Sequence, residues 1–359
     1  MLDPSRFHDL VSGRQRGVRA TLLRGVLAAA EWPYRAAVAW RNQRFERRPE
    51  KMREVDVPVI SVGNLSLGGT GKTPLVVYLA RWFRQHGVRV SLVSRGYGAK
   101  HEGRNDEALE LEQQLPDVPH LQNSNRFAAA QVAVDELETQ LILLDDGFQH
   151  RQLARDLDIV LIDALEPFGY GHVFPRGTLR EPPSSLRRAD IVGLTRADMV
   201  DEIRRAWIRQ FYSRYVSAAK WIELVHRPTQ LVRGQGAARA LDHLRGTKAL
   251  AFCGIGNPAG FEHTLAQLAC QVLDWRRFPD HHGYSRADIE NLAQWIRSFP
   301  AAEMILCTQK DLVKIGLDTL GGKPLFAVQI EMCVRAGGAF LDDQLAQVLT
   351  SIPADEEGY

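Results

Sequence analysis

Paired cysteines, long apolar runs and a strong charge of either sign are all missing from this sequence. Its 359 residues include only four cysteines, which lie far apart and form no C-x-x-C pair. Zinc sites and disulfide frameworks are therefore not expected, and the cysteine usage fits a reducing compartment such as the cytosol. No apolar run approaches the roughly 20 residues that a membrane-spanning helix needs, and arginines interrupt the amino-terminal region where a signal peptide would be apolar.

Charge and length set further limits. A formal net charge of +2 gives no overall field that would attract nucleic acid, so no nucleic-acid partner is expected. A hydrophobic share of 45% with 25% charged residues is typical of a globular protein, and the length favours two lobes over one core. We expect a basic amphipathic region over residues 1–50, a nucleotide-binding and catalytic lobe over 51–218 and a second α/β lobe over 219–359.

The most informative stretch runs from Pro58 to Pro74 and reads PVISVGNLSLGGTGKTP. Its β-branched start predicts a buried strand, and the apolar residues after it predict a helix. Glycines between them permit a turn whose N–H groups point at an anion, next to the positive end of the helix dipole. This order is that of the phosphate-binding loop, in which Lys72 would reach the β- and γ-phosphates and Thr73 would ligate Mg²⁺.

One position departs from the usual pattern of this loop. The pattern has glycine five residues before Gly71, and this chain has Ser66 there. The alternative is a glycine-rich β-α turn with an accidental Gly-Lys-Thr, but the strand before it and the helix after it favour the phosphate loop. The residues that would hold the phosphates are Ser66, Leu67, Gly68, Gly69, Thr70, Gly71, Lys72 and Thr73.

A second acidic element follows the apolar run Leu141–Leu144. This run predicts a buried strand, and Asp145 and Asp146 come directly after it. Two adjacent carboxylates at a strand end repel each other unless a cation or donor lies between them. The pair is typical of the Mg²⁺-binding element of phosphate-loop enzymes; the alternative is an acidic turn exposed to solvent.

The amino-terminal region is basic. Nine arginines but only two acids, Glu31 and Glu46, lie between Arg14 and Arg48. Apolar residues at helical spacing and tryptophans are interleaved with them, and Pro33 is expected to break or kink the helix. This pattern suits either a helix on an anionic membrane surface or a helix packed on the body with its arginines in water.

Further apolar segments predict a doubly wound, mostly parallel α/β sheet with a second, smaller α/β lobe. The predicted strands are residues 88–93, 158–162, 191–194, 249–252, 304–307 and 325–330. A long Gly- and Pro-rich loop over 169–183 carries Arg180 and Glu181 and is of a length that is usually functional or mobile. In the string FPDHH an aspartate next to a histidine could orient an imidazole for proton transfer, or the string could be a solvated turn. The string TQKD resembles the base-reading N-K-x-D only weakly.

Seven strings in this order resemble the tetraacyldisaccharide 4'-kinase family, the lipid A 4'-kinases of Gram-negative bacteria. They are SVGNLSLGGTGKTP, SRGYG, LLDDGFQHR, PRGTLREP, FCGIGNP, FPDHH and TQKD, between about Val57 and Lys314. The resemblance implies transfer of the ATP γ-phosphate to the 4'-hydroxyl of a tetraacyldisaccharide 1-phosphate. It also implies two α/β lobes with the cleft between them, and an amino-terminal helix that holds the enzyme on the cytoplasmic face of the inner membrane.

The resemblance also implies roles for single residues. Asp145 and Asp146 would lie at the metal and the γ-phosphate, and Arg180 and Glu181 would line the ATP–Mg²⁺ site, with Thr73, Asp146 and Glu181 as the metal ligands. The family's general base is an aspartate in a G-D-E-P string, assisted by a histidine. The matching positions here are Asp106, although this chain reads N-D-E-A, and His281, with His282 as a rival.

Two other classes stay open on the sequence alone. A switch ATPase or GTPase of the partitioning and metallochaperone kind has a similar loop, but such proteins often carry lysine where this chain has Leu67. A dethiobiotin-synthetase-like kinase of a small soluble acid is also possible, although it would not need the basic, aromatic amino-terminal helix.

Overall fold

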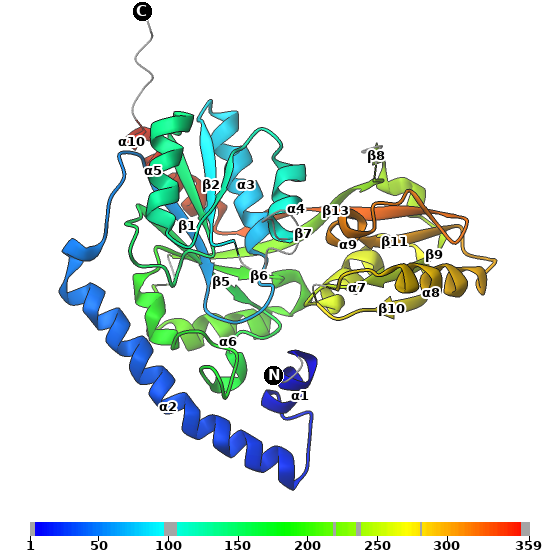
Figure 1. Ribbon diagram of the computed structural model, residues 1–359, viewed down its shortest axis with the longest axis horizontal. Helices are drawn as coiled ribbons and strands as arrows, with labels where there is room; N and C mark the ends of the chain where they lie inside the picture. The colour runs from blue at the N-terminus through cyan, green and yellow to red at the C-terminus, as the bar shows by residue number, and fades with distance from the viewer. Residues whose placement is uncertain (1–3, 97–105, 218–219, 235–237, 281, 353–359) are drawn as a thin grey trace, which may run out of the picture. The chain divides into compact units, whose positions relative to one another are not determined.

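The computed structural model describes residues 4–96, 106–217, 220–234, 238–280 and 282–352 (Figure 1). The chain forms two compact units. The first comprises Met1–Gly96, Asp117–Leu224 and Val334–Tyr359, and the second comprises Tyr97–Pro116 and Val225–Cys333. These differ from the predicted lobes, because residues 97–116 group with the second unit and the last residues of the chain group with the first.

The first unit contains a parallel sheet. Its strand order is β7-β6-β5-β1-β4-β2-β3, and each neighbouring pair is parallel. The strands are β1 (Val59–Asn64), β2 (Val90–Ser94), β3 (His120–Gln122), β4 (Leu141–Asp145), β5 (Leu157–Asp163), β6 (Ile191–Thr195) and β7 (Trp221–Val232), the last of which continues into the second unit. The strand order reverses at β1, and such a switch point is where open α/β sheets bind ligands.

Helices of the first unit are α1 (Pro4–Val11), α2 (Val18–Arg47), α3 (Lys72–Gln85), α5 (Arg126–Leu137), α6 (Glu202–Tyr212) and α10 (Gly338–Ser351), with short 3₁₀ turns between them. All six residues of β1 are buried. Helix α3 buries Leu75, Leu79 and Phe83, which recur at the spacing of one helix face. The buried face of α3 and the buried β1 hold the loop between them in place.

Helix α2 runs unbroken from Val18 to Arg47, so Pro33, which was expected to break or kink the helix, does not break it (Figure 1). Pro33 and Ala29, the residue four positions earlier, are both exposed. The carbonyl that loses its partner to the proline ring can therefore bond water, which lowers the cost of the proline. Within the described parts of the chain, none of the helices has the length and apolar content needed to cross a bilayer.

The second unit is a smaller α/β structure. Strands β9 (Lys248–Cys253), β10 (Gln271–Arg277), β11 (Met304–Thr308) and β13 (Lys323–Ala336) are parallel in the order β10-β9-β11-β13. The short strands β8 (Ala238–Arg239) and β12 (Thr319–Leu320) pair antiparallel with β7 and β13. Helices α4 (Asp106–Gln114), α7 (Pro258–Gln267), α8 (Arg286–Arg297) and α9 (Gln309–Ile315) complete the unit.

The predicted fold class is confirmed, and each strand predicted from an apolar run exists; most bounds agree within about two residues, whereas the strand predicted over 325–330 extends to Ala336 as β13. Elements that the sequence did not indicate include β3, β7 and α4. Helix α4 lies in a polar segment. It packs against α9, so tertiary contacts decide its structure more than its own sequence does.

Gly63 in β1 offers a test of this packing. A Cβ at this position would lie 2.4 Å from the Phe148 Cβ and 2.7 Å from the Phe148 backbone N. We expect Gly63→Ala to lower the free energy of unfolding by about 1–3 kcal/mol, as overpacking typically does. Urea denaturation of the full chain would measure it.

The matched control is Gly25→Ala in α2, where an added Cβ meets nothing within 4 Å. This change should leave stability equal or raise it by up to about 1 kcal/mol, because alanine favours helix. A Gly63→Ala protein as stable as the wild type would contradict the close approach of β1 to the 146–149 turn.

Candidate active site

The predicted phosphate loop lies between β1 and α3. Gly68 and Gly71 have φ values of 110° and 87°, which L side chains rarely adopt. Gly71 is also the residue that precedes the first turn of α3, so the loop ends at the positive end of the helix dipole. Backbone and helix thus have the local form that binds an anion.

Ser66, the departure from the usual pattern, lies in extended backbone. It forms a single antiparallel bridge with Leu179. On either side of it the Leu67 N donates to the Thr178 carbonyl at 2.7 Å and the Arg180 N donates to the Leu65 carbonyl at 2.6 Å. A residue in such a bridge needs no positive φ, which explains why serine is tolerated where other phosphate loops have glycine.

Side chains from three strand ends brace the loop from within. The Asn64 Nδ2 donates to Thr70 Oγ1 at 2.8 Å, and Gln149 Nε2 donates to the Asn64 carbonyl at 2.9 Å. Arg196, directly after β6, donates from Nη2 to the Gly69 carbonyl at 2.7 Å and pairs with Asp163 at the end of β5. These bonds fix the loop before any ligand binds.

Lys72, Asp146 and Arg180 form one ion cluster beside the loop. The Lys72 Nζ lies 3.4 Å from Asp146 Oδ1, and Arg180 Nη1 lies 2.8 Å from both carboxylate oxygens of Asp146. Burial alone would raise the pKa of Asp146, but the charges of Lys72 and Arg180 outweigh it and lower that pKa to about 2. Asp146 is therefore ionised at neutral pH, and two cations converge where a polyphosphate would lie.

Asp145 and Thr73 occupy the two positions expected of a magnesium site. Asp145 is the last residue of β4, is almost fully buried, and lies in register with Val62 of β1. Thr73 is buried in the first turn of α3. A hydroxyl and carboxylates are hard oxygen ligands of the kind that Mg²⁺ prefers, and such sites are usually completed by substrate phosphates. In the described part of the chain no three His, Cys, Asp or Glu residues gather as a metal site.

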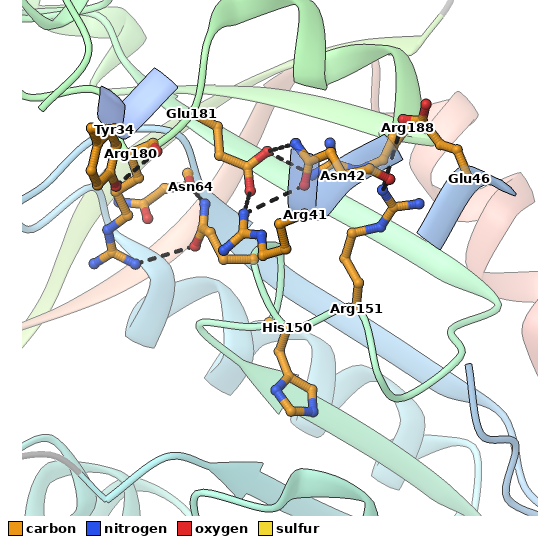
Figure 2. Close-up of polar contacts among 12 residues, drawn as sticks. Tyr34, Arg41, Asn42, Glu46, Asn64, His150, Arg151, Arg180, Glu181 and Arg188 are labelled. Carbon is orange, nitrogen blue, oxygen red and sulfur yellow. Dashed lines mark hydrogen bonds and ion pairs between the residues drawn. The ribbon is translucent and has the colours of Figure 1, made fainter. Parts of the chain in front are cut away.

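Glu181 has a different environment from the one expected of a metal ligand. Its carboxylate is fully buried and accepts from Arg41, from Asn42 Nδ2 at 2.9 Å and from Arg188 Nη2 at 3.0 Å (Figure 2). Burial alone would raise the pKa of Glu181, but the neighbouring Arg188 and Arg41 hold it below its usual value. The partners that surround it are protein donors, so its recorded contacts are those of an internal anchor for α2.

Helix α2 makes further bonds near this anchor. The Tyr34 hydroxyl donates to the Arg180 carbonyl at 3.1 Å. Glu31, also on α2, accepts from the Val173 N at 3.0 Å and lies 2.9 Å from His172 Nδ1. The loop that carries Arg180 is therefore held by the phosphate loop and by α2.

The two residues predicted to handle the proton do not lie in the first unit. Asp106 is the first residue of α4, in the second compact unit. His281 lies outside the described residues. His282 stacks on Phe278 with ring centroids 4.7 Å apart, and its Nε2 lies 3.2 Å from Asp288 Oδ2. These contacts give His282 a packing role.

Sequence reasoning did not single out Tyr34, Arg41, Asn42, Asn64, Gln149 or Arg196, although each contacts the loop or the residues beside it. Arg196 and Gln149 could have been found, since both directly follow or lie close to the carboxyl end of a predicted strand. Arg41 and Asn42 carry no such signal, because nothing in a basic helix tells which of its residues face the body.

Comparison with known proteins agrees with this geometry. Residues 23–350 match the family model described as Tetraacyldisaccharide-1-P 4'-kinase. The chain is 37% identical over 339 residues to the tetraacyldisaccharide 4'-kinase of Anaeromyxobacter dehalogenans strain 2CP-C, covering 89% of each protein. It is 36% identical over 355 residues to that of Anaeromyxobacter sp. strain Fw109-5, covering 94% of each.

A solved structure leads to the same family. The crystal structure of LpxK from Aquifex aeolicus in complex with ATP is similar with a TM-score of 0.71 and 28% sequence identity, over 91% of this chain and 99% of that one. The resemblance drawn from the seven strings is confirmed, and the switch ATPase and the dethiobiotin-synthetase-like kinase are set aside. The chain belongs to the tetraacyldisaccharide 4'-kinase family, whose members use ATP to phosphorylate a lipid A precursor at its 4' position.

Proposed function

We propose that the cluster of Lys72, Asp146 and Arg180 beside the phosphate loop is where this chain positions the transferred γ-phosphate. The supporting observation is that two cations already converge on one ionised carboxylate. Phosphoryl transfer asks a protein mainly to position groups and to neutralise charge. The backbone from Ser66 to Thr73 would hold the β- and γ-phosphates, while Lys72 and Arg180 turn from Asp146 to the phosphate oxygens.

Thr73, Asp145 and Asp146 are the residues that would hold Mg²⁺. When bound, the ion would supply positive charge that offsets the negative charge of the phosphates. Asp146 loses its two cation partners to the phosphates in this scheme and remains ionised, so it becomes available as a ligand. Glu181 would not bind the ion itself. It would support the site by holding Arg188 and α2 in place.

Asp106 would accept the proton of the 4'-hydroxyl, and His281 would assist it. A sugar hydroxyl is a weak nucleophile until a base within hydrogen-bond reach takes its proton. The oxygen then bonds to the γ-phosphorus as the bond to the ADP oxygen breaks. Because α4 belongs to the same compact unit as residues 225–333, the base and the histidine segment can be held together within that unit.

Helix α2 would attach the enzyme to an anionic membrane surface, which we place at the cytoplasmic face of the inner membrane. Val18, Leu22, Val26, Trp32 and Trp40 are 64–78% exposed and fall on the face opposite the docked residues Glu31, Val38 and Asn42. An apolar face flanked by arginines binds anionic bilayers through buried apolar area and charge.

Lys72→Met tests the role of the loop. We expect kcat for lipid phosphorylation to fall by about 100-fold or more, in line with the loss of a group that stabilises transition-state charge. Labelled ATP and a detergent-dispersed tetraacyldisaccharide 1-phosphate would measure it. Lys323→Met, which removes a half-buried lysine of the second unit whose Nζ donates to the Pro300 carbonyl, should keep wild-type turnover; equal activity in both variants would contradict the proposal.

Asp106→Ala and His281→Ala test proton transfer. Each should lower turnover by about 100-fold or more while the affinity for ATP, measured by fluorescent nucleotide displacement, stays the same. Asp242→Ala and His243→Ala change exposed residues of the same unit and serve as controls. Wild-type turnover in Asp106→Ala or His281→Ala would remove that residue from the mechanism.

Leu22→Glu combined with Val26→Glu tests the membrane surface. We expect binding to vesicles of phosphatidylglycerol and phosphatidylethanolamine, measured by sedimentation, to weaken about 10-fold or more. Two apolar side chains are replaced by carboxylates, which have the same sign of charge as the anionic membrane. Wild-type binding should also weaken with salt. The control Val132→Glu alters a 40% exposed residue of α5, and an equal loss in the control would argue against α2 as the contact.

A further inference from the structure

The string Thr308–Asp311 has no role in the function proposed above, yet it lies at a junction of the second unit. Thr308 ends β11 and precedes the first turn of α9. Its Oγ1 donates to Asp311 Oδ2 at 2.6 Å and accepts from the Asp311 N at 3.3 Å. The first turn of α9 is therefore locked to the carboxyl end of β11, the edge where α/β sheets place functional groups.

Asp311 fixes the segment that contains the FPDHH string. Its side chain is fully buried, and Oδ1 accepts from the Gly254 N at 3.0 Å and from the Tyr284 hydroxyl at 2.8 Å. Tyr284 lies two residues beyond the end of the string. At the other end the Phe278 N donates to the Cys253 carbonyl at 2.8 Å. Both ends of this segment are thus tied to the edge formed by β9 and β11.

Lys310, the neighbour of Asp311, contacts a different element. Its Nζ lies 3.4 Å from Glu110 Oε2, and the Glu110 side chain is only 9% exposed. Glu110 belongs to α4, which packs against α9. Position 110 is one helical turn from position 106, on the same side of the helix. A bond that fixes Glu110 therefore fixes the rotation of the turn that begins with Asp106.

We propose that Lys310 and Asp311 act together as a positioning brace for the transfer reaction. Asp311 places the 278–284 segment, and Lys310 places the first turn of α4 relative to it. This inference rests on the proposed role of Asp106 as the base. A base must lie within hydrogen-bond reach of the proton that it removes, and a displacement of about 1 Å can lower the rate about 100-fold.

The experiment compares Lys310→Met, Lys310→Arg and Lys248→Met in the full chain. Lys310→Met should lower kcat by about 10-fold or more while KM for ATP stays the same, and Lys310→Arg should restore most of the loss because it keeps the charge. Lys248 is an exposed lysine at the opposite end of β9, and its variant should match the wild type. A merely structural lysine would lower the melting temperature and leave kcat per folded enzyme unchanged, and this result would overturn the proposal.

A double-mutant cycle with Asp106→Asn shows whether Lys310 acts through the base. If it does, Lys310→Met should cause no further loss in the Asp106→Asn background, because the group that it positions is already gone. A second loss of the same size would overturn the brace. The charge reversal Lys310→Glu with Glu110→Lys should recover part of the kcat that either change removes alone, and no recovery would count against the pair.

The experiments distinguish failure of the brace from failure of Asp106 as the base. An inactive Asp106→Asn together with a fully active Lys310→Met would overturn the brace and leave the proposed base in place. A fully active Asp106→Asn would remove the base from the proposed function, and the brace with it.

Discussion

The arrangement of the first unit depends on the balance of charge around Asp146. Its carboxylate lies between Lys72 and Arg180, whose charges outweigh the effect of burial and lower its pKa to about 2, so it is ionised at neutral pH. The carboxylate therefore compensates the positive charges of both side chains. An uncompensated charge would be costly in a partly buried site. In the proposed function, a polyphosphate that enters this site would compete with one carboxylate for these two cations, so little reorganisation would be needed.

The second constraint is the connection of this cluster to its surroundings through backbone bonds. Arg180 belongs to a strand-like segment that pairs with residues 65–67 of the phosphate loop. The same residue accepts from Tyr34 of α2 through its carbonyl, and the next residue, Glu181, binds Arg41 and Asn42. Loop, arginine and amino-terminal helix are thus one hydrogen-bonded assembly.

Local patterns predicted what depends on local structure. The sequence predicts the strand, glycines and helix around Lys72 and the strand before Asp145, because burial, φ preference and helix periodicity act within a few residues. It does not predict contacts between segments that lie far apart in the chain. Arg41 and Glu181 are 140 residues apart, and α4 is held by α9, which lies about two hundred residues further along. The sequence could not show that α2 continues through Pro33 for a related reason. The solvent exposure that makes this proline tolerable is a property of the folded chain.

The buried carboxylate of Glu181 has a consequence for the amino-terminal helix. Two of the side chains that donate to it, Arg41 and Asn42, come from that helix. A chain without this helix would keep an ionised carboxylate inside the first unit with Arg188 as its remaining counter-charge, and an under-compensated buried charge destabilises its surroundings strongly. The helix is consequently part of the folded core structure of the first unit, and it cannot be removed or replaced without destabilising that unit.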